Sequence, residues 1–458
     1  MKLGKTKEYT NKRIGKSLEI AELDEKYLLK SSALKYYPLV VERAENSKVW
    51  DVDGNEFIDF LSSAAVYNIG HSNQKVIKAI KDQMEKSLNY IRAYFYTEPP
   101  VKLAKLLTRI TPGEFTKKVF FGFSGSDAVD LAIKVSRACS KKQNMISFYG
   151  SYHGTTYGAL SATGIIDKKI KNVVFPLKGF RFFQYADCYR CPFHLSYPGC
   201  GLECLDHIRK EIEKENTNTG AIIFEPIQGD CGIIVPPKDF IKGLSEIAKE
   251  NDLILVDEEV QSGMGRTGKL WAIEHYDVVP DLLISAKALG GGMPISAVIG
   301  RAHVMNSLPT PLSVFTHGGH AVSASSALAT IDFTINEKLP ERAKELGNHA
   351  IKRLNELKEK YKMIGDVRGK GLLIGLDIIK KGKAPDKKTA LKIGYKSWEK
   401  GLILITFGKH GNILRIAPPL TIPKEELDKG MDIIEESIKD VSEGKVKDGA
   451  IESLNAWG

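Results

Sequence analysis

The sequence predicts an α/β fold in two parts. One is a large domain with a mostly parallel seven-stranded sheet covered by helices, and the other is a smaller α+β domain formed by both chain ends. In the middle of the chain, short and almost continuously apolar runs alternate with helical patterns, as in a parallel sheet that is buried on both faces. After about residue 320 the pattern changes to longer helices and shorter apolar runs. At 458 residues the chain is long enough for two domains.

We expect the chain to divide into three stretches. Residues 1–60 contain VWDVDGNEFIDF, which is typical of a hairpin that turns at Asp-Gly, and this stretch should pack with the small domain. Residues 61–325 should form the large domain, and residues 326–458 the small C-terminal domain. We find no internal repeat and no low-complexity linker in the sequence.

Six apolar runs predict strands in the large domain, and several of them end in polar or charged residues. The runs lie at 118–124, 144–149, 221–226, 252–258, 281–286 and 296–300. Helical patterns lie between them, for example over 126–139 and 239–251. Because ligands bind beyond the carboxyl ends of the strands in open parallel sheets, the polar residues at these ends are the first candidates for a functional site.

The small domain is predicted from a different pattern. Two long helices, over 320–338 and 340–361, precede three apolar runs. These runs, at 371–379, 402–407 and 413–420, alternate with two more helical stretches. Such a mixture is typical of an α+β domain.

Charge and hydropathy argue against two classes of partner. Lys and Arg outnumber Asp and Glu by 66 to 56, but the surplus is spread along the chain, whereas nucleic-acid-binding proteins usually concentrate it in one stretch. No run of about 18 uncharged apolar residues is present, and the N-terminus has no apolar core of the length that a signal peptide needs. We therefore expect a cytoplasmic protein that binds neither nucleic acid nor membranes.

Gly125 and Ser126 stand where a predicted strand turns into a helix. Backbone N–H groups and the positive end of the helix dipole make such a junction an anion site. Ser126 would add a hydroxyl donor, and Gly125 would let the backbone approach the anion closely. The alternative is a plain helix cap, because Ser and Asp are common caps.

Acids end one predicted strand and a lysine follows the next. Asp257 and Glu258 close the run LILVDE, where carboxylates need a cationic or hydrogen-bonding partner such as a protonated ring nitrogen or Arg266. Lys287 stands between LLISA and a glycine turn, where burial can tune an amine to react with aldehydes as a Schiff base. The alternative is a lysine that snorkels beside the glycine loop.

An anion cradle, an acid for a ring nitrogen and a Schiff-base lysine are the three protein contacts that pyridoxal phosphate needs. With these residues the chain resembles the class-III pyridoxal-phosphate aminotransferases of fold type I, the group that contains ornithine, acetylornithine and 4-aminobutyrate aminotransferases. The resemblance runs from VWDVDGNEFIDF to LRIAPPLTIP, which is nearly the whole chain.

The resemblance assigns roles to the matching positions. YHG is similar to the motif whose aromatic ring stacks on the cofactor, and ILRIAPPL to the motif whose arginine forks onto the substrate carboxylate. FTHGGHAV resembles the segment whose threonine reaches a phosphate in the neighbouring subunit, which implies a homodimer or a higher oligomer with shared active sites. The implied residues are Lys287, Glu258 and Asp257 for catalysis, Gly125, Ser126, Tyr152, His153, Gln228, Gln261 and Thr316 for the cofactor, and Arg415 and Glu225 for the substrate.

The strand that carries the ring-nitrogen acid departs from the family pattern. The family usually reads Asp-Glu-Val/Ile-Gln, whereas this chain reads DEEVQ. An ungapped alignment from GMGRTG puts Glu258 at the ring-nitrogen position, and only one of two successive strand residues should reach the ring. We favour Glu258, with Asp257 as the alternative.

The resemblance implies transfer of an amino group between an amino acid (4-aminobutyrate, ornithine-like or neutral) and a 2-oxo acid. Thr155 follows YHG, where members that act on 4-aminobutyrate often carry an arginine, so a less acidic substrate is favoured. Glu225 could mask Arg415 when a substrate presents an amine or an apolar group, although a fixed salt bridge is the simpler interpretation. The alternative function is racemisation or epimerisation of an amino acid on the same scaffold, which would also use Lys287.

A second departure is the insert ADCYRCPFHLSYPGCGLEC. It contains Cys188, Cys191, Cys200 and Cys204 in the spacing C-x2-C-x8-C-x3-C. Four thiolates at this spacing could hold a structural zinc ion or an iron–sulfur cluster. Two disulfides or four free thiols are the alternatives, and nothing in the sequence points to a catalytic metal.

Overall fold

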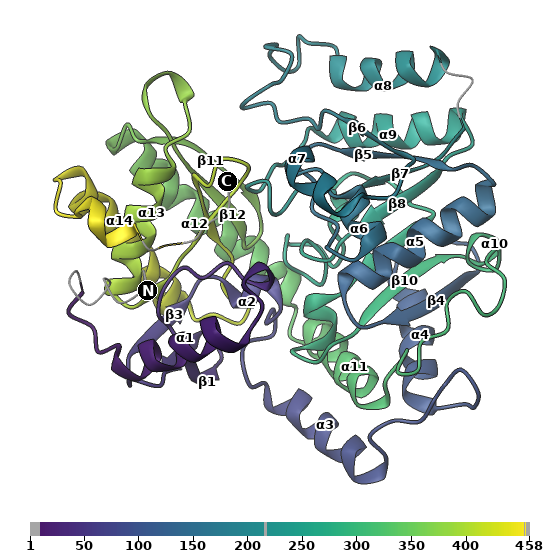
Figure 1. Cartoon of the computed structure of the whole chain (residues 1–458), viewed down its shortest axis with the longest axis horizontal. Helices are drawn as coiled ribbons and strands as arrows, with labels where there is room; N and C mark the ends of the chain where they lie inside the picture. Colours follow the sequence, from purple (N-terminus) through teal and green to yellow (C-terminus); the bar gives the residue numbers. More distant parts are fainter. Residues whose placement is uncertain (1–9, 215–217, 453, 455–458) are drawn as a thin grey trace. The chain divides into compact units, whose positions relative to one another are not determined.

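The computed structural model describes residues 10–214, 218–452 and 454. The chain divides into two compact units, one formed by Met1–Asn73 with Arg342–Gly458 and the other by Gln74–Glu341 (Figure 1). This division differs from the predicted boundaries, because residues 61–73 belong to the first unit and residues 326–341 to the second. Helix α11 (Ala321–Asn336) stays with the second unit since it packs against α3 (Gln74–Lys86) and α4 (Glu98–Ile110).

The second unit is built on a seven-stranded sheet. Its strands, from one edge to the other, are β4 (Lys117–Gly122), β10 (Ser296–Arg301), β9 (Leu282–Ser285), β8 (Ile254–Glu258), β7 (Thr219–Phe224), β5 (Asn144–Phe148) and β6 (Phe180–Phe183). Only β10 runs against both of its neighbours, and the other paired strands are parallel. The predicted mostly parallel seven-stranded sheet is confirmed. Strand β6 was not among the six predicted runs, because its four residues FRFF are too few to stand out and include a charge.

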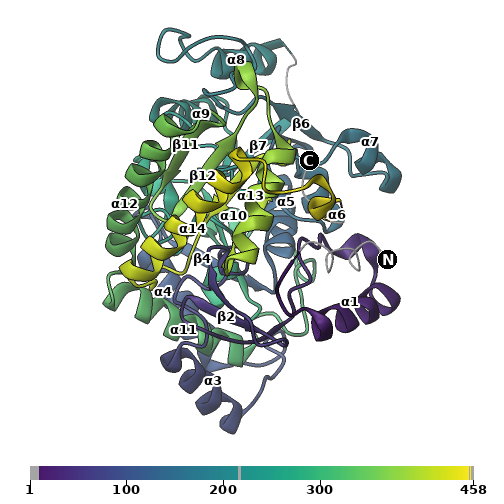
Figure 2. The same cartoon turned by 90° about the vertical axis from the view of Figure 1, so that its left-hand side faces the viewer.

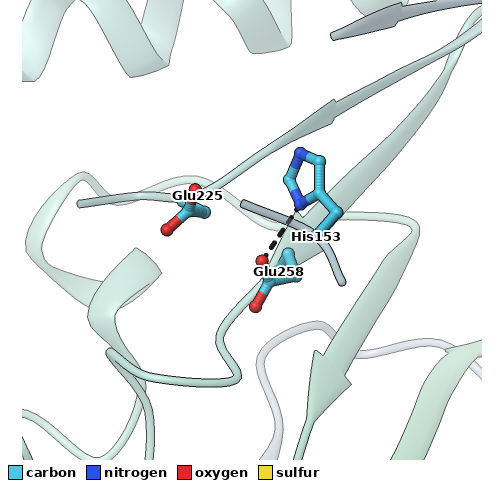
Figure 3. A group of neighbouring side chains, drawn as sticks. All are labelled: His153, Glu225 and Glu258. Carbon is cyan, nitrogen blue, oxygen red and sulfur yellow. Dashed lines mark hydrogen bonds and ion pairs between the residues drawn. The ribbon is translucent and has the colours of Figure 1, made fainter. Parts of the chain in front are cut away.

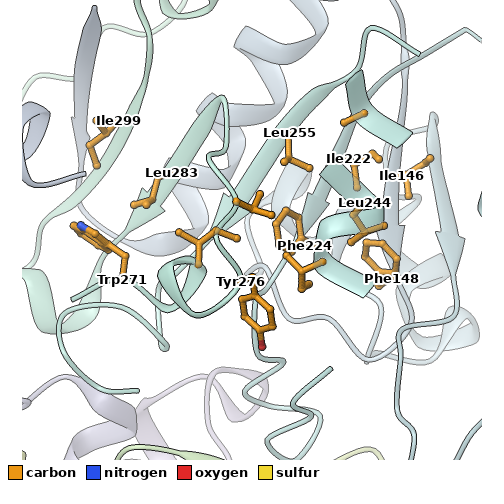
Figure 4. Packing of buried hydrophobic residues seen from close by; sticks show 14 of the residues in the cluster. Ile146, Phe148, Ile222, Phe224, Leu244, Leu255, Trp271, Tyr276, Leu283 and Ile299 are labelled. Carbon is orange, nitrogen blue, oxygen red and sulfur yellow. The ribbon is translucent and has the colours of Figure 1, made fainter. Parts of the chain in front are cut away.

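Helices cover both faces of this sheet, so its strands contribute side chains alternately to two apolar clusters. On one face, α5 (Gly125–Ser140), α6 (Tyr157–Ala162) and α10 (Ala302–Met305) pack over residues such as Val256 and Ile284. On the other face, α4, α8 (Glu203–Lys214), α9 (Lys238–Glu250) and α11 cover Leu255, Leu283 and the aromatic residues shown in Figure 4. Successive residues of β8 therefore face opposite sides of the sheet.

The first unit contains two four-stranded sheets. The strands are β1 (Val41–Glu45), β2 (Lys48–Asp51), β3 (Glu56–Asp59) and β13 (Leu402–Ile403) in one, and β11 (Ile364–Lys370), β12 (Leu373–Ile378), β15 (Ile413–Ile416) and β14 (Thr406–Phe407) in the other. Both chain ends contribute to the first of these sheets, as predicted for an α+β domain, and β2 and β3 form the hairpin expected at Asp-Gly.

Helices of this unit pack beside its sheets (Figure 2). They are α1 (Gly15–Tyr27), α2 (Ser62–Ala65), most of α12 (Leu339–Lys360), α13 (Lys387–Glu399) and α14 (Lys424–Ser442), and the short α7 (Lys168–Lys171) belongs to the other unit. Among the helices that the structure describes, none is long and apolar enough to cross a membrane.

Candidate active site

Most of the predicted site residues gather at one edge of the seven-stranded sheet. Strands β5, β7, β8 and β9 run parallel, so their carboxyl ends meet at the same edge. YHG follows β5, Glu225 follows β7, the acids close β8, and Lys287 follows β9. The structure thus brings these predicted residues to one edge of the sheet and supplies the contacts between them.

The turn at Gly125 and Ser126 opens helix α5. Ser124 is the cap residue and forms a capping box with Asp127, so the capping role falls to these two residues. A Cβ atom on Gly125 would lie 2.8 Å from a methyl carbon of Val260, so glycine is required there. The capping box occupies the Asp127 N–H, and the N–H groups of Gly125 and Ser126 precede it at the start of the helix, the position at which an anion binds.

The motif YHG is fastened directly to this turn. Gly154 has a φ of +122°, and a Cβ atom there would lie 2.1 Å from Ser126 Oγ. The backbone N–H of Thr155 donates to the same Ser126 oxygen at 3.2 Å. Tyr152, two residues earlier, is half-buried, and burial followed by the charge of Asp230 raises the pKa of its hydroxyl. The anion turn and the aromatic residue thus belong to one connected structure.

Glu258 is held by the histidine of YHG. His153 Nδ1 lies 3.0 Å from Glu258 Oε2, and the backbone N–H of Val260 donates to Glu258 Oε1 at 2.8 Å. Figure 3 shows this pair with Glu225 beside it, and ligand atoms of the three residues lie within 4.8 Å of one another. Because His153 is joined through Gly154 to Ser126, Glu258 faces the side of the sheet on which α5 lies.

Asp257 lies on the other face of the same strand. It is fully buried, on the same face as Glu259 two residues further on. Burial raises its pKa well above the usual range, with the charge of Glu259, a side-chain hydrogen bond with Glu259 and the charge of Glu258 as further causes. Tyr185 and Tyr276 belong to the cluster under α8 and α9. Burial raises the pKa of both hydroxyls, and the charge of Asp257 is among the further causes.

The third acid of DEEVQ has a structural contact. Glu259 accepts the backbone N–H groups of Ala272 at 2.6 Å and Ile273 at 2.8 Å, which fixes the segment after GMGRTG. Burial raises the pKa of Glu259 to about 7. Its two backbone donors identify it as an anchor of the loop rather than as the group for a ring nitrogen.

Lys287 begins a short 3-10 turn, Lys287–Gly290, directly after β9. Its φ is +43°, a left-handed conformation that costs energy for a residue with a side chain and that is often kept at functional sites. Ile284, three residues earlier, is the register partner of Glu258 on the neighbouring strand. The lysine therefore lies one strand from the acid, at the same edge.

Two glutamines and one further acid complete the edge. Glu225 accepts the N–H groups of Tyr152 and Gly229, both at 2.9 Å, and burial followed by the charge of Glu258 raises its pKa. Gln228 Nε2 donates to the Tyr149 carbonyl at 3.1 Å. Gln261 Nε2 donates to Asp230 Oδ1 at 2.8 Å, a buried contact between residues 31 positions apart that the sequence did not predict.

Arg415 and Thr316 do not belong to the strands that form this edge. Arg415 is a buried residue of β15 in the first unit, where its guanidinium stacks 3.3 Å from the centre of the Phe407 ring. The proposed pairing with Glu225, which belongs to the second unit, stays a prediction. Thr316 lies on the loop before α11 and is exposed, as a residue that contacts a neighbouring subunit has to be.

The four cysteines of the insert lie in the stretch that runs from β6 to Cys204 in the first turn of α8. All four line one small hollow. Burial, followed by the charges of Cys200 and Cys191, raises the pKa of Cys188 to about 11. Burial likewise raises the pKa of Cys204 to about 12, with Cys188 and Cys200 among the further causes.

These residues fit pyridoxal phosphate. Two glycines bring backbone close to a helix N-terminus that suits a phosphate, and a carboxylate fixed by a histidine suits a ring N–H. His153 Nε2 is a buried atom for which the described residues provide no hydrogen-bond partner, so the polar group can serve a bound molecule. An amine at the same edge suits the cofactor aldehyde.

A family model described as aminotransferase class-III matches residues 30–438. The leucine/methionine racemase of Thermococcus litoralis is 46% identical over 96% of this chain and 99% of that protein. The isoleucine 2-epimerase of Lentilactobacillus buchneri is 38% identical over 95% and 97%. A 5-aminovalerate aminotransferase of Pseudomonas aeruginosa is 36% identical over 89% and 95%.

The fold also matches solved structures. The crystal structure of an amine transaminase from an uncultivated Pseudomonas species in its PLP-bound form superposes with a TM-score of 0.82 and 27% identity. The match covers 88% of this chain and 94% of the other.

Proposed function

Because the chain belongs to the class-III aminotransferase family, a group of pyridoxal-phosphate-dependent enzymes, we propose that it transfers the amino group of a neutral amino acid to a 2-oxo acid at the edge around Lys287. The observation that carries this proposal is the placement of Lys287, in a left-handed turn one strand away from Glu258. Thr155, exposed and uncharged after YHG, favours a neutral substrate over one with a distant carboxylate. A cytoplasmic location stays a prediction.

Lys287 is the proposed proton carrier. When bound, pyridoxal phosphate supplies the aldehyde that takes up the substrate amine and the ring that stores electrons released at Cα. Lys287 Nζ would take the proton from Cα and hold it near the site of its return. Its position at the start of a short turn, with glycines following, leaves the side chain room to move between these tasks.

Glu258 is the proposed partner of the ring nitrogen. His153 and the Val260 N–H hold both of its oxygens, which fixes its orientation. A charged acid there keeps the ring nitrogen protonated. Asp257, on the opposite face and with its pKa raised, is proposed to be a neutral core residue.

The remaining roles follow the contacts. The first turn of α5 would bind the phosphate, Tyr152 would stack on the ring, and Gln228 and Gln261 would hold the groups around it. Arg415 would bind the substrate carboxylate, because the planar guanidinium that Phe407 holds flat can donate two parallel hydrogen bonds. Glu225 would lie on the substrate side.

We also propose that the active unit is a homodimer in which Thr316 reaches the partner's phosphate. Support comes from exposed apolar residues on two loops, the one before α4 and the one before α11 that carries Thr316. A monomer rarely leaves so many apolar side chains exposed. The exposed residues are Tyr90, Tyr94, Phe95, Tyr96, Leu312 and Val314. Asn89 Nδ2 donates a hydrogen bond to Nδ1 of His317, beside Thr316, at 3.1 Å, which joins the two loops.

Thr316→Ala is therefore expected to weaken cofactor binding without changing the oligomer. Loss of one hydrogen bond to a charged phosphate predicts a Kd for pyridoxal phosphate about 10-fold higher. Titration of the cofactor into apoenzyme, followed by absorbance, measures it. Thr310→Ala, an exposed threonine of the same loop, is the control. An unchanged Kd in Thr316→Ala, or a monomeric wild-type protein in sedimentation, contradicts the shared site.

Racemisation or epimerisation is the second candidate function. The specific observation in its favour is that relatives at 46% and 38% identity carry these activities, whereas the aminotransferase relative is 36% identical. Both reactions begin with removal of the Cα proton by Lys287, and they differ in where a proton returns. A neutral substrate is expected for either one.

The test uses the pyridoxal-loaded enzyme and single neutral L-amino acids in the absence of any oxo acid. Transamination converts the cofactor to its amine form and releases one equivalent of oxo acid per site, after which the reaction stops. Racemisation leaves the cofactor spectrum in place while the D-isomer accumulates over many turnovers. If neither change occurs with neutral amino acids but 4-aminobutyrate responds, the proposed substrate class is wrong.

A further inference from the structure

The insert between β6 and α8 brings four cysteines to one place. Three of them lie in a loop without helix or strand, and the fourth, Cys204, lies in the first turn of α8. All four line a hollow of about 20 Å³. None of them is joined in a disulfide.

The backbone around the cysteines is already arranged in turns. The N–H of His194 donates to the carbonyl of Cys191 at 3.0 Å, and the N–H of Glu203 donates to that of Cys200 at 3.3 Å. One turn thus follows the pair Cys188 and Cys191, and the other lies between Cys200 and Cys204. Tight turns of this kind let two nearby cysteines bind the same metal ion. Apolar and aromatic residues make up most of the remaining lining, among them Phe193, Leu195 and Leu202, and two acids, Asp187 and Glu203, also line it.

We propose that Cys188, Cys191, Cys200 and Cys204 bind one structural zinc ion. Four sulfur donors on two short segments match the tetrahedral geometry that zinc prefers in closed sites. A hollow of about 20 Å³ has space for a single ion. Four protein sulfurs would fill the coordination sphere of a zinc ion, which suits a structural rather than a catalytic ion.

Binding has to draw the sulfurs together. Within the described part of the chain, the group of three ligand atoms that lies within 4.8 Å is His153, Glu225 and Glu258, not a group of cysteines. Because the first three cysteines lie in the loop, the loop can close onto Cys204, which the helix holds in place. The ion would then join a long irregular loop to α8, and α8 packs against α9 of the large unit.

The test is the metal content of the full-length holoenzyme, purified with a thiol reductant and without a metal-affinity column. We expect one zinc ion per chain, retained after dialysis and released when a mercurial reagent blocks the thiols. Cys188→Ser and Cys204→Ser should each lose the ion and show faster proteolysis within the insert. Cys139→Ser, a substitution on α5 outside the insert, should retain it.

Other results would overturn the proposal, and each is distinguishable. If the wild-type protein contains no metal and all six cysteines react after unfolding, the four cysteines of the insert are free thiols. If the protein contains no metal and only Cys139 and Cys231 react after unfolding without reductant, the four cysteines of the insert form two disulfides. Iron with acid-labile sulfide means a cluster. The variants are compared by metal content and by proteolysis, so the result does not depend on which amino-acid substrate the enzyme uses.

Discussion

Lys287→Ala is expected to remove catalysis while leaving the fold intact. The residue starts the short turn after β9, and its own side chain is half-buried whereas the following Ala288 and Leu289 are buried. Loss of the amine that moves the Cα proton predicts a fall in kcat of about 100- to 10,000-fold. The cofactor should still bind through the α5 turn, but its absorbance should shift to that of the free aldehyde. Stopped-assay turnover and the absorbance spectrum measure both effects.

Lys118→Ala is the matched control, because Lys118 is an exposed residue near the start of β4 and far along the strand from the carboxyl edge. It should keep turnover and spectrum unchanged. Circular dichroism and the melting temperature of the two variants should agree with the wild type within a few degrees. Full activity in Lys287→Ala would refute the assignment of the whole site.

A small primary amine gives a further check on Lys287. If the alanine variant lacks only a proton carrier, added methylamine or ethylamine should restore part of its turnover in a concentration-dependent way. Rescue would depend on pH through the fraction of free amine. A purely structural role for Lys287 predicts no rescue at any concentration.

The sequence predicts the sheet and the edge because both follow from local pattern. A strand buried on two faces must be continuously apolar, so a charged or glycine-rich break after it marks its carboxyl end. Asp257, Glu258 and Lys287 stand at such breaks, and the parallel order of β8 and β9 brings them to one edge. Strand β6 escaped because four residues give too little pattern.

What the sequence leaves open depends on contacts between distant segments. The partner of Glu258 is His153, which lies 105 residues away, and the anchoring of Gly154 on Ser126 joins two other strand ends. The boundary near residue 341 depends on α11 packing against α3 and α4, which no local pattern records. Periodicity shows that a helix is amphipathic but not which domain it covers.

The choice between the two acids of β8 can be tested with a pair of isosteric amides. Glu258→Gln removes the negative charge that His153 and the Val260 N–H orient, so the ring nitrogen loses the group that keeps it protonated. We expect a fall in kcat of about 100-fold, in the range found when one preorganised electrostatic contact is lost. The pH at which the cofactor spectrum titrates should also move, which a change in packing alone would not cause.

Asp257→Asn should behave differently, because an amide closely resembles the neutral form of an acid whose pKa burial holds well above its usual range. Its oxygens face the cluster that contains Tyr185 and Tyr276, so turnover should change by less than about 3-fold and stability by about 1 kcal/mol. If Asp257→Asn lost activity and the spectral titration moved while Glu258→Gln kept both, the assignment would be reversed. Successive residues of β8 face opposite sides of the sheet, with Val256 against α5 and Leu255 against α9. Only one of Asp257 and Glu258 can therefore reach the cofactor ring. Asp257, the first acid of DEEVQ, is then a core residue rather than a second catalytic group.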